Sequence, residues 1–144
     1  MKRWLLILPI LIFTACSDAD LAKVAKSMVA ASVAVGQVQT DVIEANSLGL
    51  ISEKTTEDIL EVCLKVNLAG KQVDAVLRGI SKLDPASRQA LVNVLTPISQ
   101  ALDVSQLEFM AGIKDPATKQ KVEAGFLLAR SAISSIQIII ASGG

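Results

Sequence analysis

Apolar side chains recur at alternating steps of three and four residues along most of this 144-residue chain. An α-helix makes one turn every 3.6 residues, so this spacing places the apolar side chains on one helical face. The most regular stretches run through Leu21, Val24, Met28, Ala31, Val35, Val38, Val42 and Ala45, through Ile59, Cys63, Val66, Gly70, Val73, Leu77 and Ile80, and through Val122, Phe126, Ala129, Ile133, Ile136 and Ile140. Stripes of this kind predict an all-α fold whose helices meet along apolar seams.

Four residues with the chemistry of helix N-caps divide the chain into segments of similar length: Ser17, Ser52, Asp84 and Asp115. Proline follows both aspartates, at the first helical position, where no intrahelical hydrogen bond is lost. Near-equal segments joined by short turns predict one domain, residues 16–144, folded as an antiparallel up-down-up-down four-helix bundle. The expected helices span residues 18–47, 53–82, 85–113 with breaks, and 116–141.

The third helix carries a proline in its middle. Leu91, Leu95 and Ile98 keep the apolar spacing around it, but Pro97 has no backbone N–H to donate. We therefore expect this helix to be kinked or broken at Pro97. In the second case Thr96 would cap a new, short helix.

The first fifteen residues have the layout of a signal peptide. Lys2 and Arg3 form a positively charged start, and an apolar run of about ten residues follows, too short to span a bilayer as a helix. The run ends in the string FTAC at residues 13–16. Residues 1–16 resemble the start of a bacterial lipoprotein precursor, in which a small residue precedes a cysteine that is lipidated and becomes the new N-terminus. The resemblance implies that residues 1–15 are removed and that Cys16 carries the lipid.

By the same resemblance, Ser17 directly after the lipidated cysteine favours export to the periplasmic face of the outer membrane, in a host that has one. The expected location is thus the cell envelope, with the chain held at the membrane by its lipid. Two alternatives remain open. Cleavage after Ala19 would release a soluble secreted protein, and retention of residues 1–15 would leave an uncleaved anchor.

Composition excludes several classes of function. The 14 basic and 14 acidic residues balance, which is untypical of a nucleic-acid-binding protein. The chain has no histidine, the commonest general base and metal ligand. Beyond residue 15 the only aromatic side chains are those of Phe109 and Phe126, so stacking platforms are scarce. We expect no nucleic-acid partner, no cofactor, no metal site and no enzymatic activity.

The residues that remain as candidates for chemistry have simpler interpretations. Cys63 lies on the apolar stripe of the second helix, which predicts a buried thiol rather than a nucleophile. Glu57 and Glu61 stand one helical turn apart and are interpreted as part of a solvated face rather than as metal ligands. No catalytic residue is assigned.

The bundle topology brings distant residues together at its two ends. The N-terminus, the turn near residue 84 and the C-terminus would share one end, and the other two turns would lie about 40 Å away. Arg78, Lys82 and Arg88 would then cluster at the membrane end, where they are candidates for contact with anionic headgroups.

At the far end, apolar residues fall in the predicted turns. Leu50, Ile51, Phe109 and Met110 are candidates for contact with a protein partner. The alternative is that these side chains close the end of the bundle core.

These features favour a non-enzymatic, lipid-anchored bundle that acts as a structural or protein-interaction module, with a protein partner that the sequence does not identify. The alternative is a carrier that binds a small apolar ligand between its helices, although alanine, valine and glycine at the seams favour close packing. Residues 124–141 contain a single charge, at Arg130, which leaves insertion of the fourth helix into a membrane as a less favoured alternative.

Overall fold

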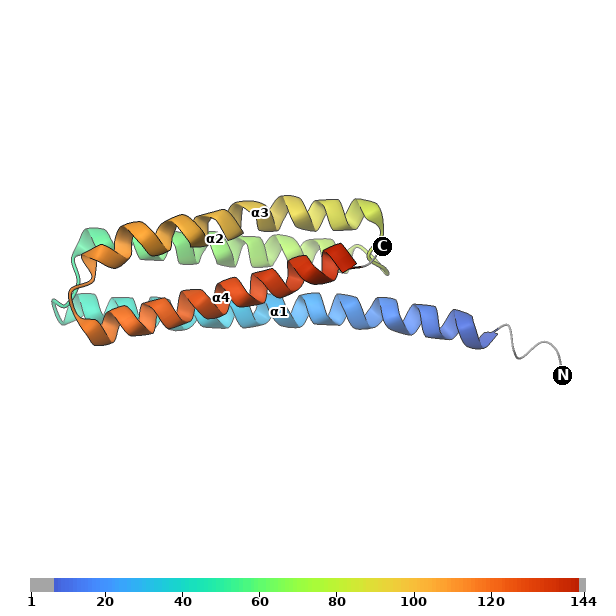
Figure 1. The fold of residues 1–144 in the computed structure, drawn as a ribbon, viewed down its shortest axis with the longest axis horizontal. Coiled ribbons are helices and arrows are strands. Elements are labelled where there is room, and N and C mark those ends of the chain that lie inside the picture. Colours follow the sequence, from blue (N-terminus) through green and yellow to red (C-terminus); the bar gives the residue numbers. More distant parts are fainter. Residues whose placement is uncertain (1–6, 143–144) are drawn as a thin grey trace.

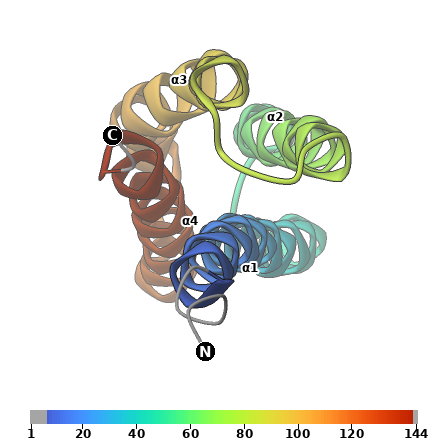
Figure 2. The same ribbon diagram turned by 90° about the vertical axis from the view of Figure 1, so that its right-hand side faces the viewer.

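The computed structural model describes the backbone of residues 7–142 and the side chains of residues 19–103 and 108–142. Its helices are α1 (Ile7–Ser47), α2 (Glu53–Arg78), α3 (Pro85–Glu108), the 3-10 turn η1 (Phe109–Gly112) and α4 (Pro116–Ser142). They run up and down along one long axis (Figure 1) and surround a common core (Figure 2). Each helix contacts the next in sequence, and α4 closes the ring against α1. The predicted all-α up-down-up-down four-helix bundle is confirmed.

The core consists of one apolar stripe from each helix, largely as the spacing predicts. In α1 every stripe residue from Val24 to Ala45 is buried, and in α4 all six are. The stripe of α2 is buried from Ile59 to Val73, apart from Gly70, and half-buried at Leu77 and Ile80. Burying a branched aliphatic side chain contributes about 1.5–3 kcal/mol, so these stripes are the main source of stability.

Side-chain caps start three of the four helices where the sequence predicts. The hydroxyl of Ser52 accepts from the backbone N–H of Thr55 at 3.1 Å. A carboxylate oxygen of Asp84 accepts from Ser87 N at 2.8 Å, and one of Asp115 accepts from Thr118 N at 2.7 Å. The hydroxyl and the backbone N–H of Thr118 lower the pKa of Asp115, and the backbone N–H and hydroxyl of Ser87 lower that of Asp84, because these hydrogen bonds stabilise the charged carboxylates.

Two predicted helix boundaries are wrong. Ser17 does not cap a helix, because α1 begins at Ile7 and continues through Ser17, with no breaker between the apolar run and the core stripe. The end of α2 lies at Arg78 rather than at residue 82, since Gly79 ends the helix and its N–H bonds to Val76 O. The turn that follows buries Leu83 in the core.

The sequence predicts either a kink or a break at Pro97. The helix α3 continues through Pro97, so the predicted break does not occur. Pro97 lies on the exposed side of the helix, and the hydroxyl of Thr96 donates to the carbonyl oxygen of Val92 at 2.8 Å. The carbonyl left without a helical donor belongs to Asn93, which is also exposed. The helix ends at Glu108, and η1 replaces the last predicted turn.

The helices α1 and α4 approach each other closely at Gly125. A Cβ atom on Gly125 would overlap a methyl group of Val38 and lie 3.4 Å from the backbone oxygen of Ala34. Gly125 is buried, and the missing side chain lets the two backbones approach. The packing of α1 on α4 therefore depends on glycine at this position.

We predict that Gly125→Ala lowers the free energy of unfolding by about 1–3 kcal/mol, because the added methyl group overfills a packed interface. The matched control is Gly36→Ala on α1, where a Cβ would meet no atom within 4 Å. That variant should gain about 0.5–1 kcal/mol from helix propensity. Urea unfolding of both variants measures the difference, and equal effects at the two positions would refute the close-packing argument.

Candidate functional site

The end of the bundle expected near the membrane gathers three parts of the chain. The N-terminal part of α1, the turn between α2 and α3 and the C-terminus of α4 all lie toward the same end (Figure 1). The side chain of Cys16 lies outside the described residues. Among the α1 side chains that the structure describes, the first in contact with the core are half-buried Leu21 and buried Val24.

The three basic residues predicted at this end differ in what their side chains contact. Arg78 is exposed, and its Nε donates to a carboxylate oxygen of Asp74 at 2.7 Å, which raises the pKa of Arg78. Lys82 is exposed. Arg88 is half-buried and donates to two backbone carbonyls, those of Leu83 at 2.8 Å and Ile140 at 2.6 Å. Arg88 therefore joins the end of α4 to the start of α3, and Arg78 and Lys82 are the more accessible cations.

The apolar residues predicted as partner contacts at the far end are mostly buried. Ile51, Phe109 and Met110 are each 7% exposed or less, and the ring of Phe109 packs against that of Phe126 with centroids 5.4 Å apart. The prediction that these three form a contact surface is thus wrong, because closing the end of the bundle buries them. Of the four candidates only Leu50 is exposed. It follows Gly49, whose positive φ of 71° ends α1.

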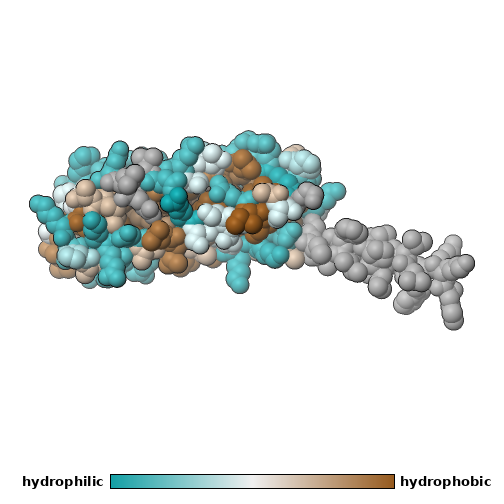
Figure 3. All heavy atoms as spheres, in the orientation of Figure 1, coloured by the Kyte–Doolittle hydropathy of each residue, from teal (hydrophilic) through white to brown (hydrophobic). Residues whose placement is uncertain are grey.

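The exposed apolar residues that the sequence interpretation missed lie on the sides of the helices. The large ones are Val29, Val33, Ile43, Leu64, Leu68, Val92, Leu127, Leu128 and Ile138. On the surface they form separate apolar patches among polar residues (Figure 3). The sequence contained a signal for these exposed residues: most of them fall on the polar side of a predicted helix, outside its apolar stripe.

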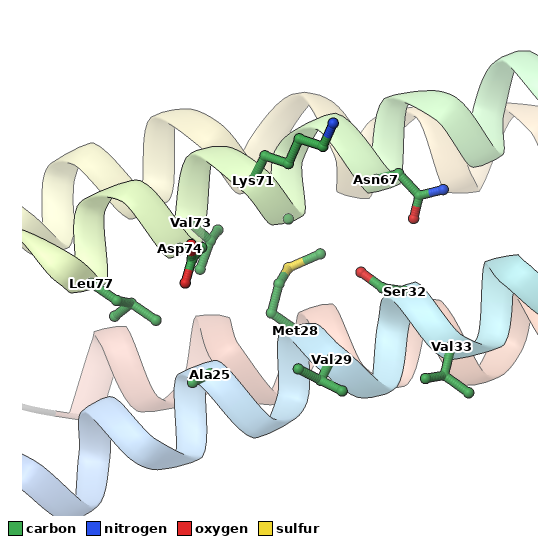
Figure 4. Close-up of a pocket in the computed structure, with 11 residues that line it drawn as sticks. Ala25, Met28, Val29, Ser32, Val33, Asn67, Lys71, Val73, Asp74 and Leu77 are labelled. Atoms are coloured by element: carbon green, nitrogen blue, oxygen red, sulfur yellow. The ribbon is translucent and has the colours of Figure 1, made fainter.

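A groove runs between α1 and α2 and encloses about 440 Å³, within the usual size range of small-molecule sites. Met28, Ser32 and Val33 belong to its α1 wall, and Lys71 and Leu77 to its α2 wall (Figure 4). We call this site the α1–α2 groove, and its full lining is Ala25, Met28, Val29, Ser32, Val33, Asn67, Gly70, Lys71, Val73, Asp74 and Leu77.

Between residues 127 and 138 the exposed side of α4 carries large apolar side chains. Leu127, Leu128 and Ile138 are exposed there, and Ser135 turns its hydroxyl back to the carbonyl oxygen of Ser131 at 3.0 Å. The single charge of this stretch, on Arg130, is paired with Asp103 of α3 at 2.5 Å. We call the surface formed by Leu127, Leu128, Ser131, Ser135 and Ile138 the α4 outer face.

Two helical ranges, Ala19–Ser47 and Pro116–Ser142, are long and apolar enough to cross a membrane by length and hydropathy alone. Core helices of soluble bundles meet the same criterion. Here the apolar stripes of both ranges pack into the bundle core. Membrane insertion of the second range would bring the charge of Arg130 into the bilayer, and in the bundle Arg130 has an ion-pair partner.

Cys63 is completely buried, on the core side of α2. Burial raises the pKa of its thiol to about 12, since the thiolate would lose its hydration. A thiol in this state is a poor nucleophile at neutral pH. Among the residues that the structure describes, no group of three or more acidic, cysteine or histidine side chains is arranged to hold a metal ion.

Comparison with protein-family models, with curated proteins and with solved structures gave no match to this chain. The functional argument therefore depends on the residues and their geometry alone.

We predict that Cys63 resists alkylation in the folded protein. Iodoacetamide at pH 8 should modify Cys63 only after denaturant is added, because both burial and the raised pKa suppress the reactive thiolate. Peptide mass spectrometry with and without denaturant measures the modified fraction. Rapid modification of the native protein would show that α2 opens or that the thiol is accessible.

Proposed function

We propose that this chain is a non-enzymatic lipoprotein of the cell envelope, a helical bundle that is anchored through a lipid on Cys16 and acts as a structural or protein-interaction module. The anchoring part is carried by the string FTAC at residues 13–16, which ends the signal-peptide-like segment. The core residues that the structure describes all follow Cys16, so cleavage before Cys16 retains them. The short stretch between Cys16 and Leu21 then joins the lipid to the folded bundle.

The geometry of the membrane end supports this arrangement. The N-terminal part of α1 lies at the end of the bundle that also holds Arg78 and Lys82, while the turns at residues 48–52 and 109–115 lie at the opposite end (Figure 1). Exposed cations near anionic headgroups add about 1 kcal/mol each to membrane attachment. A single acyl chain binds only marginally, so a second, electrostatic contribution is useful to an anchored protein.

We propose the α4 outer face as the contact surface for a protein partner. An exposed helical side usually carries charged residues, and this one carries exposed Leu127, Leu128 and Ile138 instead. Apolar surface of this kind is typical of protein contacts. On this proposal the bundle stands on the membrane by its lipid and presents α4 sideways to its partner.

Intact mass of the protein from the membrane fraction tests the anchor. We expect a chain that begins at Cys16 and carries diacylglycerol and an acyl group. Cys16→Ser should abolish lipid attachment and cleavage at that site, while Cys63→Ser, the matched control, should leave both unchanged. A lipid-free chain that begins at Asp20 would replace the proposal with a secreted bundle, and a chain that keeps residues 1–15 would indicate an uncleaved anchor.

Photo-crosslinking in intact cells tests the partner surface. A benzophenone amino acid in place of Leu128 should form one discrete protein adduct, whereas the same group in place of exposed Lys54 on α2 should not. Adding Leu127→Glu and Ile138→Glu should abolish the adduct and leave the melting temperature unchanged, because both side chains are exposed. Adducts with phospholipid instead of protein would favour the membrane-inserting alternative.

A further inference from the structure

We propose that the α1–α2 groove binds a fatty acid, with the alkyl chain on the apolar floor of the groove and the carboxylate at Lys71. This inference develops the alternative that the bundle carries a small apolar ligand between its helices, and it names the binding site and the class of ligand. It concerns a different surface from the α4 outer face and does not depend on lipidation of Cys16.

The shape of the groove suits one unbranched chain. It extends from Ala25 to Val33 along α1 and from Asn67 to Leu77 along α2, which corresponds to about 12–15 Å of helix. Its walls are mostly apolar, and Met28 contributes a flexible side chain that adapts to irregular contacts. The length of the groove and its mostly apolar lining fit an alkyl chain.

Gly70 belongs to the floor of the groove, at a point where side chains of α1 approach α2 closely. A Cβ atom at Gly70 would lie 3.2 Å from Ser32 Oγ and 3.5 Å from Met28 Cε, so those two side chains occupy space directly opposite. Any longer side chain at this position would extend into the groove. A larger side chain at position 70 would therefore displace Ser32 and Met28 or take up part of the groove.

The charges around the groove favour an anionic head. Lys71 lines it, and no carboxylate lies within ion-pair distance of this lysine in the part of the chain that the structure describes. The one acidic residue of the lining, Asp74, is neutralised by Arg78 at 2.7 Å. Exposed Lys26 adds a further positive charge on the same edge of α1 as Val29 and Val33. An anion at this rim meets net positive charge.

A free fatty acid fits these charges better than a choline lipid. Recognition of a quaternary ammonium group uses aromatic faces, and both aromatic side chains of the described residues, Phe109 and Phe126, are buried elsewhere. One unpaired lysine at the rim suits one small monoanionic head. The ligand is thus assigned by its charge and its single chain.

The experiment uses a photoactivatable diazirine analogue of dodecanoate and the protein as the cell processes it, held in phosphatidylcholine nanodiscs if it carries a lipid and free in buffer if it does not. After irradiation, peptide mass spectrometry should place the label within residues 25–33 and 67–77, with saturable concentration dependence. Label spread evenly over all four helices, or confined to other segments, would overturn the proposal.

Two pairs of variants distinguish binding of the alkyl chain in the groove from binding of the carboxylate at Lys71. Gly70→Leu should weaken labelling about tenfold, because it excludes one or two methylenes from the floor, and Gly36→Leu, in open space on α1, should not. Lys71→Gln should weaken dodecanoate labelling about two- to fivefold, as for an exposed charge pair, while Lys119→Gln should not. Lys71→Gln should leave labelling by the neutral dodecanol analogue unchanged.

Each result decides one part of the inference. Undiminished labelling of Gly70→Leu would refute the groove as the site. Equal loss for the acid and the alcohol in Lys71→Gln would refute recognition of the carboxylate. If Gly70→Leu lowers the melting temperature, Ser32→Leu fills the same space from the α1 wall and takes its place.

Discussion

The packing of α1 against α4 is the contact on which the rest of the bundle depends, because it closes the ring of four helices. Gly125 leaves room for a methyl group of Val38, and the ion pair between Lys121 and Asp41, 3.8 Å apart, joins the same two helices. With α4 held in place, Phe126 reaches Phe109 and the far end of the core is closed. Removing this contact would expose apolar stripes on all four helices.

The helix ends determine which surfaces are available for function. Caps at Ser52, Asp84 and Asp115 fix where α2, α3 and α4 begin, and Arg88 fixes where α4 ends against α3. The turns between these points are short, so little apolar chain remains outside the core at either end. As a result, the exposed apolar surface lies on the sides of the bundle, on the α4 outer face and around the α1–α2 groove.

A bundle of this construction offers binding surfaces rather than catalytic groups. Its one described cysteine is buried with a pKa of about 12, and Arg130, the single charge in the most apolar segment, is neutralised by Asp103. Lys71 differs from the other residues of the α1–α2 groove, because it is a cation beside apolar surface without a carboxylate partner in the described part of the chain. The proposed anchor attaches a lipid covalently at Cys16, and the proposed fatty-acid site in the α1–α2 groove buries an alkyl chain reversibly.

The sequence by itself determined the helices and their order, because helical periodicity and capping are local properties. The stripes from Val24 to Ala45 and from Val122 to Ile140 predicted the buried faces, and Asp84 and Asp115 predicted the starts of α3 and α4. The tertiary structure alone decided whether an apolar residue outside a stripe is buried. Ile51 and Met110 enter the core and Leu128 does not, because burial depends on which helix lies opposite. The α1–α2 groove has the same origin, since its width is a distance between two helices that no local pattern encodes.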